Sequence, residues 1–220
     1  MTHEFDKDYW EQHWRQTISG APAAMDGNPP NPYLVRGTSS LMPGTALDAG
    51  CGAGAEAIWL ASQGWQVTAA DISADALNRA TRRATNSGVA QQVRWIEADL
   101  TVWSPETQFD LVTTHYAHPA MPQLAFYERV SSWVAPGGTL LIVGHLHTQD
   151  FTHTHDSTEH ENHGQHPPAE ASVAVADISA VLDGTLWEIV TAEEQLRTLT
   201  GPAGQAVDLR DVVVQAARRT

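Results

Sequence analysis

The sequence predicts an α/β fold: a doubly wound, mostly parallel seven-stranded sheet with one antiparallel C-terminal strand and helices on both faces. Between residues 45 and 144, short apolar runs alternate with helical segments, a pattern typical of a parallel sheet covered on both sides. Near the C-terminus, two strand-like runs at 186–198 and 207–217 are joined by the turn residues Gly201-Pro202-Ala203-Gly204. This arrangement predicts a hairpin, which places an antiparallel strand in the sheet.

Length and composition fit a single domain over residues 1–220. A chain of 220 residues is long enough to bury roughly 70% of its unfolded surface in one core. Hydrophobic residues make up 42% of the chain and charged residues 17%, as in ordinary globular proteins. Within this domain we expect an N-terminal helical cover at 1–42 and a histidine-rich loop or lid at 145–172.

Residues typical of helix starts and helix ends support the expected boundaries of several elements. An aromatic helix is expected at 5–16, Gly64 is placed to end one helix, and Ser73 is placed to cap the next. The other expected helices lie at 33–41, 55–63, 74–86, 123–134 and 173–182, and the expected strands of the parallel region lie at 45–49, 66–71, 93–97, 109–113 and 139–144, the last opened by Pro136-Gly137-Gly138.

A glycine-rich loop between the first strand and its helix is the strongest functional signal. Gly50, Gly52 and Gly54 remove side chains where a ligand would lie, and the amides of the following helix point at the same crevice. Asp71 stands about 20 residues further on, at the end of the second strand, where a carboxylate can accept hydrogen bonds from ribose hydroxyls. Asp99 follows the third strand and is placed to meet the amino group of an adenine.

The glycine spacing alone leaves the cofactor open, because Gly50 to Ala55 also satisfies the GxGxxA pattern of nicotinamide and flavin enzymes. Three features favour S-adenosylmethionine instead. Asp48 precedes the first glycine, where it can face a cationic ammonium group but would repel a pyrophosphate. Asp99 supplies a second carboxylate on the adenine side, and the C-terminal hairpin is uncommon in dinucleotide dehydrogenases.

Residues 45–144 resemble the core of the class I, Rossmann-like S-adenosylmethionine-dependent methyltransferases. The resemblance rests on LDAGCGAG, VTAADIS, EADL, FDLVTT and VAPGGTLLIVG, while the opening DYWEQHW is similar to the N-terminal cover helix of the thiopurine and tellurite-resistance methyltransferase group. It implies S-adenosylmethionine as cofactor and S-adenosylhomocysteine as product. The cofactor-binding residues expected are Trp14, Asp48, Gly50, Cys51, Gly52, Gly54, Asp71, Ile72, Asp99, Leu100 and Thr114; for Trp10 and Trp14, lining the site and packing in the core are both open.

The acceptor is expected to be a small molecule methylated on oxygen, nitrogen, sulfur or a metalloid. A hydroxyl or ammonium acceptor needs a base, and His115 and His118, in the loop after the fourth strand, are the catalytic candidates, with Tyr116 and then His145 next. The stretch from Thr113 to Pro119 lacks the Asn/Asp-Pro-Pro-Tyr arrangement of amino-methylating DNA and glutamine enzymes.

Charge and cysteine content limit the partners. A formal charge of −14 disfavours nucleic acid, whose phosphates need clustered Lys and Arg. Neither a signal peptide nor an apolar run long enough to span a membrane is present, and the single Cys51 cannot form an intramolecular disulfide. We therefore expect a cytoplasmic protein without nucleic-acid or membrane partners; its oligomeric state is not predicted.

Seven histidines between residues 145 and 166 raise the alternative of a divalent metal. Imidazole and carboxylate are good ligands for zinc, nickel or copper, and the candidate ligands are His153, His155, His160 and His163. Their spacing matches no recognised site, so a polar lid without metal is the competing interpretation. Two alternative functions therefore stay open. The glycine spacing allows a nicotinamide-dependent oxidoreductase, and the histidines allow a non-enzymatic metal-binding protein.

Overall fold

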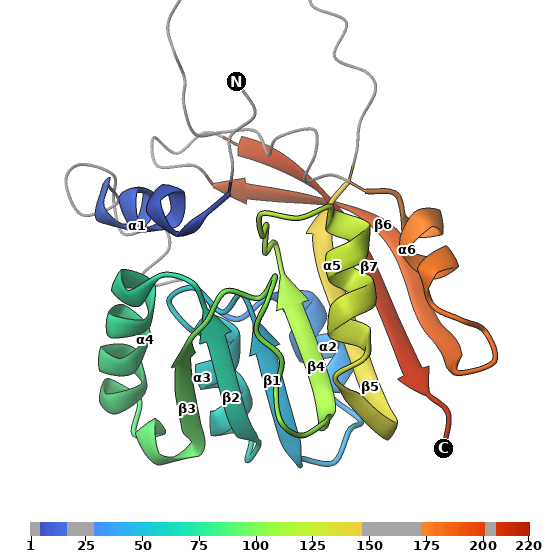
Figure 1. The fold of residues 1–220 in the computed structure, drawn as a ribbon, viewed down its shortest axis with the longest axis horizontal. Coiled ribbons are helices and arrows are strands. Elements are labelled where there is room, and N and C mark those ends of the chain that lie inside the picture. The colour runs from blue at the N-terminus through green and yellow to red at the C-terminus, as the bar shows by residue number, and fades with distance from the viewer. Residues whose placement is uncertain (1–4, 17–28, 147–172, 201–205) are drawn as a thin grey trace, which may run out of the picture.

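The computed structural model describes residues 5–16, 29–146, 173–200 and 206–220, and in these ranges it shows a seven-stranded sheet in the order β3-β2-β1-β4-β5-β7-β6 (Figure 1). The strands are β1 (Thr45–Ala49), β2 (Gln66–Asp71), β3 (Val93–Glu97), β4 (Phe109–His115), β5 (Val134–His145), β6 (Trp187–Thr200) and β7 (Ala206–Arg218). The helices are α1 (Lys7–Gln16), α2 (Pro32–Thr38), α3 (Ala55–Ser62), α4 (Ala74–Asn86), α5 (Gln123–Ser131) and α6 (Val175–Val181), with a 3₁₀ turn, η1 (Ala90–Gln92).

The directions of the strands confirm the predicted fold class. Strands β1 to β5 pair in parallel, whereas β7 is antiparallel to both of its neighbours, β5 and β6. The first strand reverses the order of the sheet, since β2 and β3 extend from one side of β1 and β4 and β5 from the other. In parallel sheets a reversal of this kind opens a crevice at the carboxyl ends of the strands.

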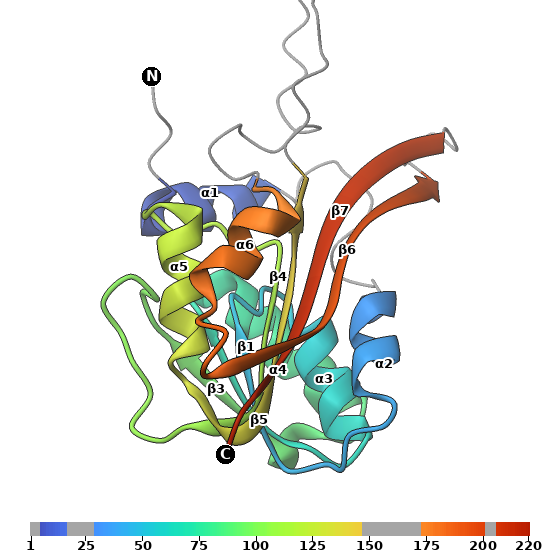
Figure 2. The same ribbon diagram turned by 90° about the vertical axis from the view of Figure 1, so that its right-hand side faces the viewer.

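Helices cover both faces of the sheet, so the core is divided in two (Figure 2). On one face α5 and α6 bury Phe126, Tyr127 and Ile178 against the sheet. On the other face α2, α3 and α4 pack Leu34 and Leu60, among others, against it. Neighbouring strand residues alternate between the two clusters, which is the period of two that an extended chain requires.

Most element ends differ from expectation by a few residues, and the largest difference is at the start of β5. We expected the strand to begin after Pro136-Gly137-Gly138, but it begins at Val134 and contains that triplet. The pairing with β4 jumps from Phe109–Val134 to Leu111–Thr139, so the triplet forms a bulge inside the strand. Gly137 makes this possible because its φ of 80° lies in the left-handed region.

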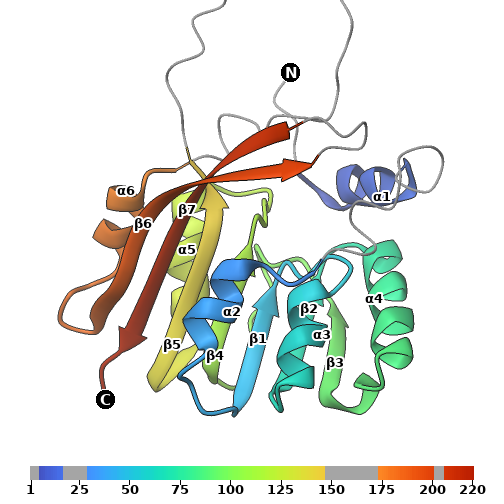
Figure 3. The same cartoon turned by 180° about the vertical axis from the view of Figure 1, so that it is seen from behind.

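The far end of the β6–β7 hairpin and helix α1 lie at the carboxyl end of the parallel strands (Figures 1 and 3). The pairing of β5 with β7 stops at His145–Asp211, whereas β6 and β7 continue to pair as far as Thr200–Ala206. The hairpin therefore reaches beyond the sheet. The expected turn at 201–204 lies outside the described residues, and so does the expected lid at 145–172 except for its first two residues, of which His145 ends β5. No described helix has the length and apolar character needed to cross a membrane.

Candidate active site

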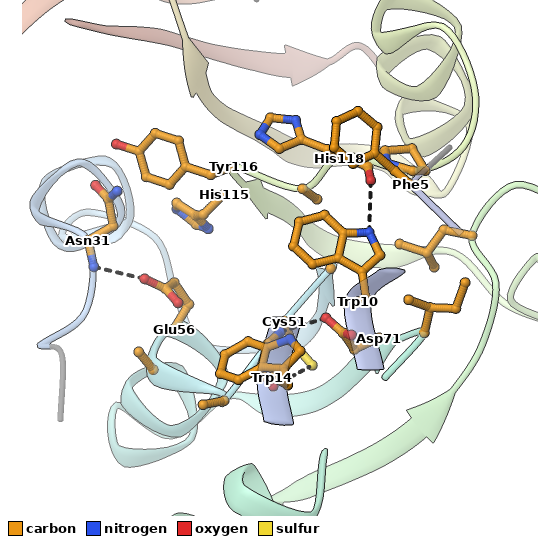
Figure 4. Close-up of a pocket in the computed structure, with 18 of the residues that line it drawn as sticks. Phe5, Trp10, Trp14, Asn31, Cys51, Glu56, Asp71, His115, Tyr116 and His118 are labelled. Carbon is orange, nitrogen blue, oxygen red and sulfur yellow. Dashed lines mark hydrogen bonds between the residues drawn. The ribbon is translucent and has the colours of Figure 1, made fainter. Parts of the chain in front are cut away.

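A cavity of about 420 Å³ lies at the carboxyl end of the parallel strands (Figure 4). Its walls come from the loops after β1, β2, β3 and β4, from α1, from the chain before α2, and from β6. We call two parts of it by name. The donor side is lined by Trp14, Gly50, Cys51, Gly52, Ala53, Asp71, Ile72, Asp99 and Leu100; the acceptor side is lined by Phe5, Trp10, Asn31, Glu56, His115, Tyr116, His118 and Arg197.

The glycine loop brings backbone rather than side chains to the donor side. Gly50 and Gly52 line the cavity, with φ values of 79° and 49° that a side chain rarely adopts. A Cβ on Gly50 would lie 2.4 Å from the Cβ of Ala117, so the chain after β4 passes directly over this residue. A Cβ on Gly52 would lie 3.0 Å from the ring of Trp14. Both positions need glycine because another part of the protein closes over the loop.

The expectation that Gly54 clears space for a ligand is wrong. A Cβ there would lie 2.5 Å from the ring of Trp95 and 3.0 Å from Ala80, and Gly54 is not among the cavity residues. Its φ of 76° and these contacts identify it as the residue that lets the start of α3 pack closely on α4 and β3.

Asp71 ends β2 and is held in place by the backbone on either side of it. Its Oδ2 accepts a hydrogen bond from the Gly52 amide at 2.8 Å, and its Oδ1 accepts one from the Ser73 amide at 2.9 Å. Burial raises the pKa of this carboxyl, while the two amides oppose the rise. Each oxygen keeps a second lone pair for a ligand in the cavity. Asp71 can therefore still accept the hydrogen bonds from ribose hydroxyls that the sequence predicts.

Asp48 lies beneath the glycine loop and does not itself line the cavity. It is buried, and its Oδ2 has no hydrogen-bond partner in the described part of the chain. Burial, together with the charges of Glu56 and Asp71, raises its pKa well above the usual range. An unpartnered buried carboxyl oxygen is costly, and a nearby cation or donor would relieve that cost. Cys51 beside it is also buried with a raised pKa, which fits a filler rather than a nucleophile.

The remaining predicted cofactor residues divide between the cavity and the core. Ile72, Leu100 and Asp99 line the donor side. One carboxylate oxygen of Asp99 accepts hydrogen bonds from the amide and hydroxyl of Thr101, so this residue also makes a local turn. Thr114 is buried in β4, its hydroxyl has no partner among the described residues, and it does not line the cavity.

Helix α1 covers the cavity and contributes an aromatic residue to each side. The Trp10 indole donates a hydrogen bond to the backbone oxygen of His118 at 3.2 Å (Figure 4). Trp14 lines the donor side and also packs in a small core with Ala53 and Ala76, so both of its expected roles are present. The Arg79 guanidinium stacks on the Trp14 ring, 5.5 Å from its centroid.

Polar contacts fasten α1 to the start of α4. A Glu11 carboxylate oxygen accepts a hydrogen bond from the Ala74 amide at 2.8 Å. Arg15 pairs with Asp75 at 2.9 Å and with Glu11 at 3.6 Å. Negative charge beside the first turn of α4 suits the helix dipole. Helix α1 is thus anchored on α4, whose N-cap, Ser73, lies two residues after Asp71.

Three histidines gather on or beside the acceptor side and are held neutral by burial. His115 and His118 line the cavity, and burial lowers the pKa of each. Burial, with the nearby His118, lowers the pKa of His145 to about 4. The His145 ring lies 5.4 Å from that of His118 and 4.7 Å from that of Tyr116. Of the two candidate bases, His115 has its ring near the Thr113 hydroxyl at 3.3 Å, while His118 contacts the Gln123 amide oxygen at 3.4 Å.

A buried hydrogen-bond network closes the acceptor side. Tyr116 donates from its hydroxyl to Asp211 at 2.8 Å, and Arg197 donates to the same hydroxyl at 2.8 Å and to the other oxygen of Asp211 at 3.0 Å. Asp211 is fully buried. Tyr116 is the residue other than glycine with a left-handed backbone in the described part of the chain, with φ at 53°. Strain of this kind persists where the surroundings fix the residue.

Several of these residues carry no signal in the sequence. Arg197 and Asp211 lie in β6 and β7, about 80 and about 95 residues from Tyr116, and only the pairing of the hairpin with β5 brings them together. Asn31 and Glu56 are joined by a hydrogen bond that the backbone N–H of Asn31 donates to a carboxylate oxygen of Glu56 at 3.1 Å. A periodicity or motif search has no means to pair positions so far apart.

The metal candidates remain predictions. His153, His155, His160 and His163 lie outside the described residues. Within the ranges that the structure describes, no three His, Cys, Asp or Glu side chains gather as a metal site would require.

Comparisons with known proteins find methyltransferases. Residues 46–138 match a family model described as a methyltransferase domain. A probable thiol methyltransferase of Arabidopsis thaliana is 30% identical over 137 residues, which cover 60% of this chain and 59% of that protein. A thiocyanate methyltransferase of the same plant is 33% identical over 105 residues, 47% and 44% of the two chains.

A third relative has a different named substrate. A ribosomal RNA small subunit methyltransferase from Alcanivorax borkumensis is 34% identical over 108 residues, 46% of this chain and 32% of that protein. This chain thus spans between 32% and 59% of the length of these curated relatives. All three relatives are named as methyltransferases, while their named acceptors differ.

Solved structures share the fold across almost the whole chain. TehB from Haemophilus influenzae superimposes with a TM-score of 0.67 at 16% identity, covering 97% of this chain and 67% of that one. The N-methyltransferase NodS from Bradyrhizobium japonicum, solved with S-adenosylhomocysteine, gives a TM-score of 0.64 at 16% identity, covering 96% and 98%. At these identities the likeness concerns the fold alone.

Proposed function

We propose that this chain, whose residues 46–138 match a methyltransferase-domain family, is a class I methyltransferase that transfers a methyl group from S-adenosylmethionine to a small-molecule acceptor. One observation carries the proposal: a single cavity joins the glycine loop and Asp71 to a group of neutral histidines. A donor held by the first group and an acceptor held beside the second would share one water-poor space, which is what transfer between them needs.

The donor side fits an adenosyl group with a cationic tail. Asp71 offers both carboxylate oxygens to ribose hydroxyls, and Leu100 and Ile72 offer apolar surface to a base. The unpartnered oxygen of Asp48 supports a cationic group nearby, because an ammonium would stabilise the ionised carboxylate that burial otherwise disfavours. The amides at the start of α3 have the polarity that suits a carboxylate. S-adenosylmethionine, when bound, would supply a methyl group on a sulfonium, whose carbon–sulfur bond breaks as the acceptor atom bonds to the methyl carbon in line and S-adenosylhomocysteine leaves.

On the acceptor side, His115 is the group best suited to remove a proton. Its ring borders the cavity, and burial keeps it neutral, so the lone pair is free at neutral pH. His118 is more constrained, since its ring contacts Gln123 and its backbone oxygen receives the Trp10 indole. We therefore assign the base to His115 and a wall of the acceptor side to His118.

A nicotinamide-dependent oxidoreductase is the second candidate, because the loop spacing also satisfies GxGxxA. Asp48 beneath the loop opposes it, because an ammonium group would stabilise the ionised carboxylate that burial disfavours, whereas the phosphates of a dinucleotide would destabilise it further. The names of the relatives favour methyl transfer and include thiol and thiocyanate acceptors.

The experiment that tests the assignment of the donor side compares Asp71→Ala with the wild type by calorimetric titration with S-adenosylhomocysteine. We expect affinity to fall more than tenfold, because charge-assisted hydrogen bonds to the ribose are lost. Asp183→Ala removes an exposed carboxylate that is not part of the cavity, and its affinity should equal that of the wild type. Unchanged affinity in Asp71→Ala, with the thermal unfolding midpoint retained, would show that the ribose is held elsewhere.

A further inference from the structure

The charges around the acceptor side limit what it can hold. Two arginines line the cavity in the described part of the chain, Arg83 and Arg197. Arg83 donates to the backbone oxygen of Ala53, at the donor side. Arg197 is thus the cation that faces the acceptor side, and its surroundings determine whether an anion could bind there.

Arg197 is already matched by a buried carboxylate. Its Nε donates to Asp211 at 3.0 Å, and Asp211 is fully buried while the Arg197 side chain is 23% exposed. A second donor of the guanidinium holds the Tyr116 hydroxyl, which in turn donates to Asp211. The pair therefore carries no net charge, although the guanidinium keeps further N–H groups that can donate.

The other groups on this side add negative rather than positive charge. Glu56 is half-buried, and one of its oxygens accepts a hydrogen bond from the Asn31 amide. His115 and His118 are neutral, because burial lowers the pKa of both. The net charge that these residues present is therefore negative. An anion placed here would lose its hydration without gaining a counter-ion from the protein.

Aromatic and proline surfaces make up much of the remaining wall. Phe5 stacks on Trp10 with ring centroids 6.1 Å apart, and Phe5 also contacts the His118 ring at 5.9 Å. Pro29 and Pro30 line the same cavity. A flat, apolar molecule would bury its faces against these rings, while a polar edge could reach the guanidinium of Arg197.

We propose that the acceptor is an uncharged, largely apolar molecule whose neutral oxygen accepts a hydrogen bond from Arg197, and that the Arg197–Asp211 pair with Glu56 excludes anionic acceptors. This inference names the acceptor class of the methyl transfer proposed above and rests on it. Tyr116 and Asp211 act as positioning residues, since they hold the guanidinium and do not themselves need to touch the acceptor.

Two compounds that differ only in charge test this directly: the primary amide and the carboxylate of para-(mercaptomethyl)benzoic acid. Both are titrated into the protein saturated with S-adenosylhomocysteine, so that binding is measured apart from turnover. We expect the amide to bind at least tenfold more tightly than the carboxylate. Equal or tighter binding of the carboxylate overturns the proposal, and so does failure of both compounds to bind.

Charge variants then test the residues. Asp211→Asn leaves the charge of Arg197 unmatched, so the preference for the amide should shrink at least fivefold. Because Asp211 is buried and its variant can fail to fold, Glu56→Gln serves as a second variant. It should reduce the preference for the amide over the carboxylate by about two- to threefold. Glu188→Gln, which removes an exposed charge outside the cavity, is the control and should leave the ratio unchanged. A ratio unmoved by Glu56→Gln contradicts the proposal.

The saturation step separates this proposal from the function on which it rests. If S-adenosylhomocysteine itself does not bind, the proposed methyl transfer fails, and the acceptor class fails with it. If S-adenosylhomocysteine binds and the carboxylate is preferred, the donor assignment stands and the acceptor class alone is wrong.

Discussion

The two sides of the cavity are built in different ways. Apart from Trp14 of α1, the donor side is contributed by residues at or just after the ends of three neighbouring strands, β1, β2 and β3, so most of its geometry comes from the sheet itself. The acceptor side is assembled from α1 and the chain just before it, the chain before α2, the start of α3, the end of β4 with the loop after it, and β6, whose Arg197 is held by Asp211 of β7. One side depends on backbone at the ends of parallel strands, and the other on side chains brought together by tertiary packing.

The difference separates what the fold requires from what a particular reaction requires. Glycines and a strand-end carboxylate can serve any reaction that uses the same donor, while the acceptor side is free to vary with the substrate. Substitutions on the two sides should therefore have separable effects, on donor affinity or on turnover.

The largest effect is expected from His115→Gln, which removes the proposed base but keeps a polar side chain. Turnover with an acceptor that must lose a proton should fall about 100-fold, the lower end of what a positioned base contributes. The affinity for S-adenosylhomocysteine should change less than twofold, because His115 belongs to the acceptor side. Rates are measured by formation of S-adenosylhomocysteine from the methyl donor.

His118→Gln is the matched comparison, because this histidine lines the same side in a more constrained setting. We expect a smaller loss, about tenfold or less, expressed mainly in KM. Equal losses of kcat in both variants would contradict the assignment of the base to His115.

A smaller effect concerns the dependence of stability on pH. As the pH falls, the buried group beside the acceptor side lowers the free energy of unfolding, while the buried group beneath the donor side raises it. Burial lowers the pKa of His145 from 6.5 to about 4, so the unfolded chain takes up a proton that the folded chain refuses. Stability linked to His145 is present above about pH 6.5 and is lost as the pH falls towards 4. Asp48, beneath the glycine loop of the donor side, has a raised pKa, so its protonation in acid favours the folded state.

His145→Phe isolates the acceptor-side contribution while keeping a ring against Tyr116 and His118. Between about pH 7.5 and about pH 5, the wild type should lose about 1–2 kcal/mol of unfolding free energy more than the variant. Urea denaturation at the two pH values measures the difference. Parallel losses in the two proteins would mean that His145 is not held neutral in the folded state.

What the sequence could and could not predict follows the same division. The order of elements, the antiparallel β7, the cap at Ser73 and the position of Asp71 were predictable, because each depends on periodicity or on residues near in the chain. The bulge in β5 was not, because apolar patterning does not reveal where a strand starts to pair. Arg197 and Asp211 were not predictable, since only the hairpin brings them to Tyr116.

Two predicted cofactor residues show the limit of motif reasoning in the other direction. Gly54 and Thr114 belong to the right segments, yet the first packs against Trp95 and the second is buried in β4. A motif identifies the loop and the strand. It does not distinguish a residue that faces a ligand from one that faces its own core.

The smallest effect is expected at the cover helix, which serves both sides. Arg15→Met breaks the ion pairs of the exposed Arg15 side chain with Asp75 and with the buried Glu11. Exposed ion pairs contribute little, so the affinity for S-adenosylhomocysteine should fall about threefold or less, and the difference should vanish in about 1 M salt. Arg219→Met, which breaks an exposed pair with Glu188, is the control. A loss in Arg15→Met that persists at high salt would argue against a purely electrostatic tether.

The central claim is that the glycine loop and Asp71 hold S-adenosylmethionine rather than a dinucleotide. The most direct test is calorimetric titration of the purified, metal-free protein with S-adenosylhomocysteine, with NAD titrated in parallel. We predict stoichiometric binding of S-adenosylhomocysteine with micromolar affinity and no measurable binding of NAD. Binding of NAD alone, or of neither compound, would contradict the account.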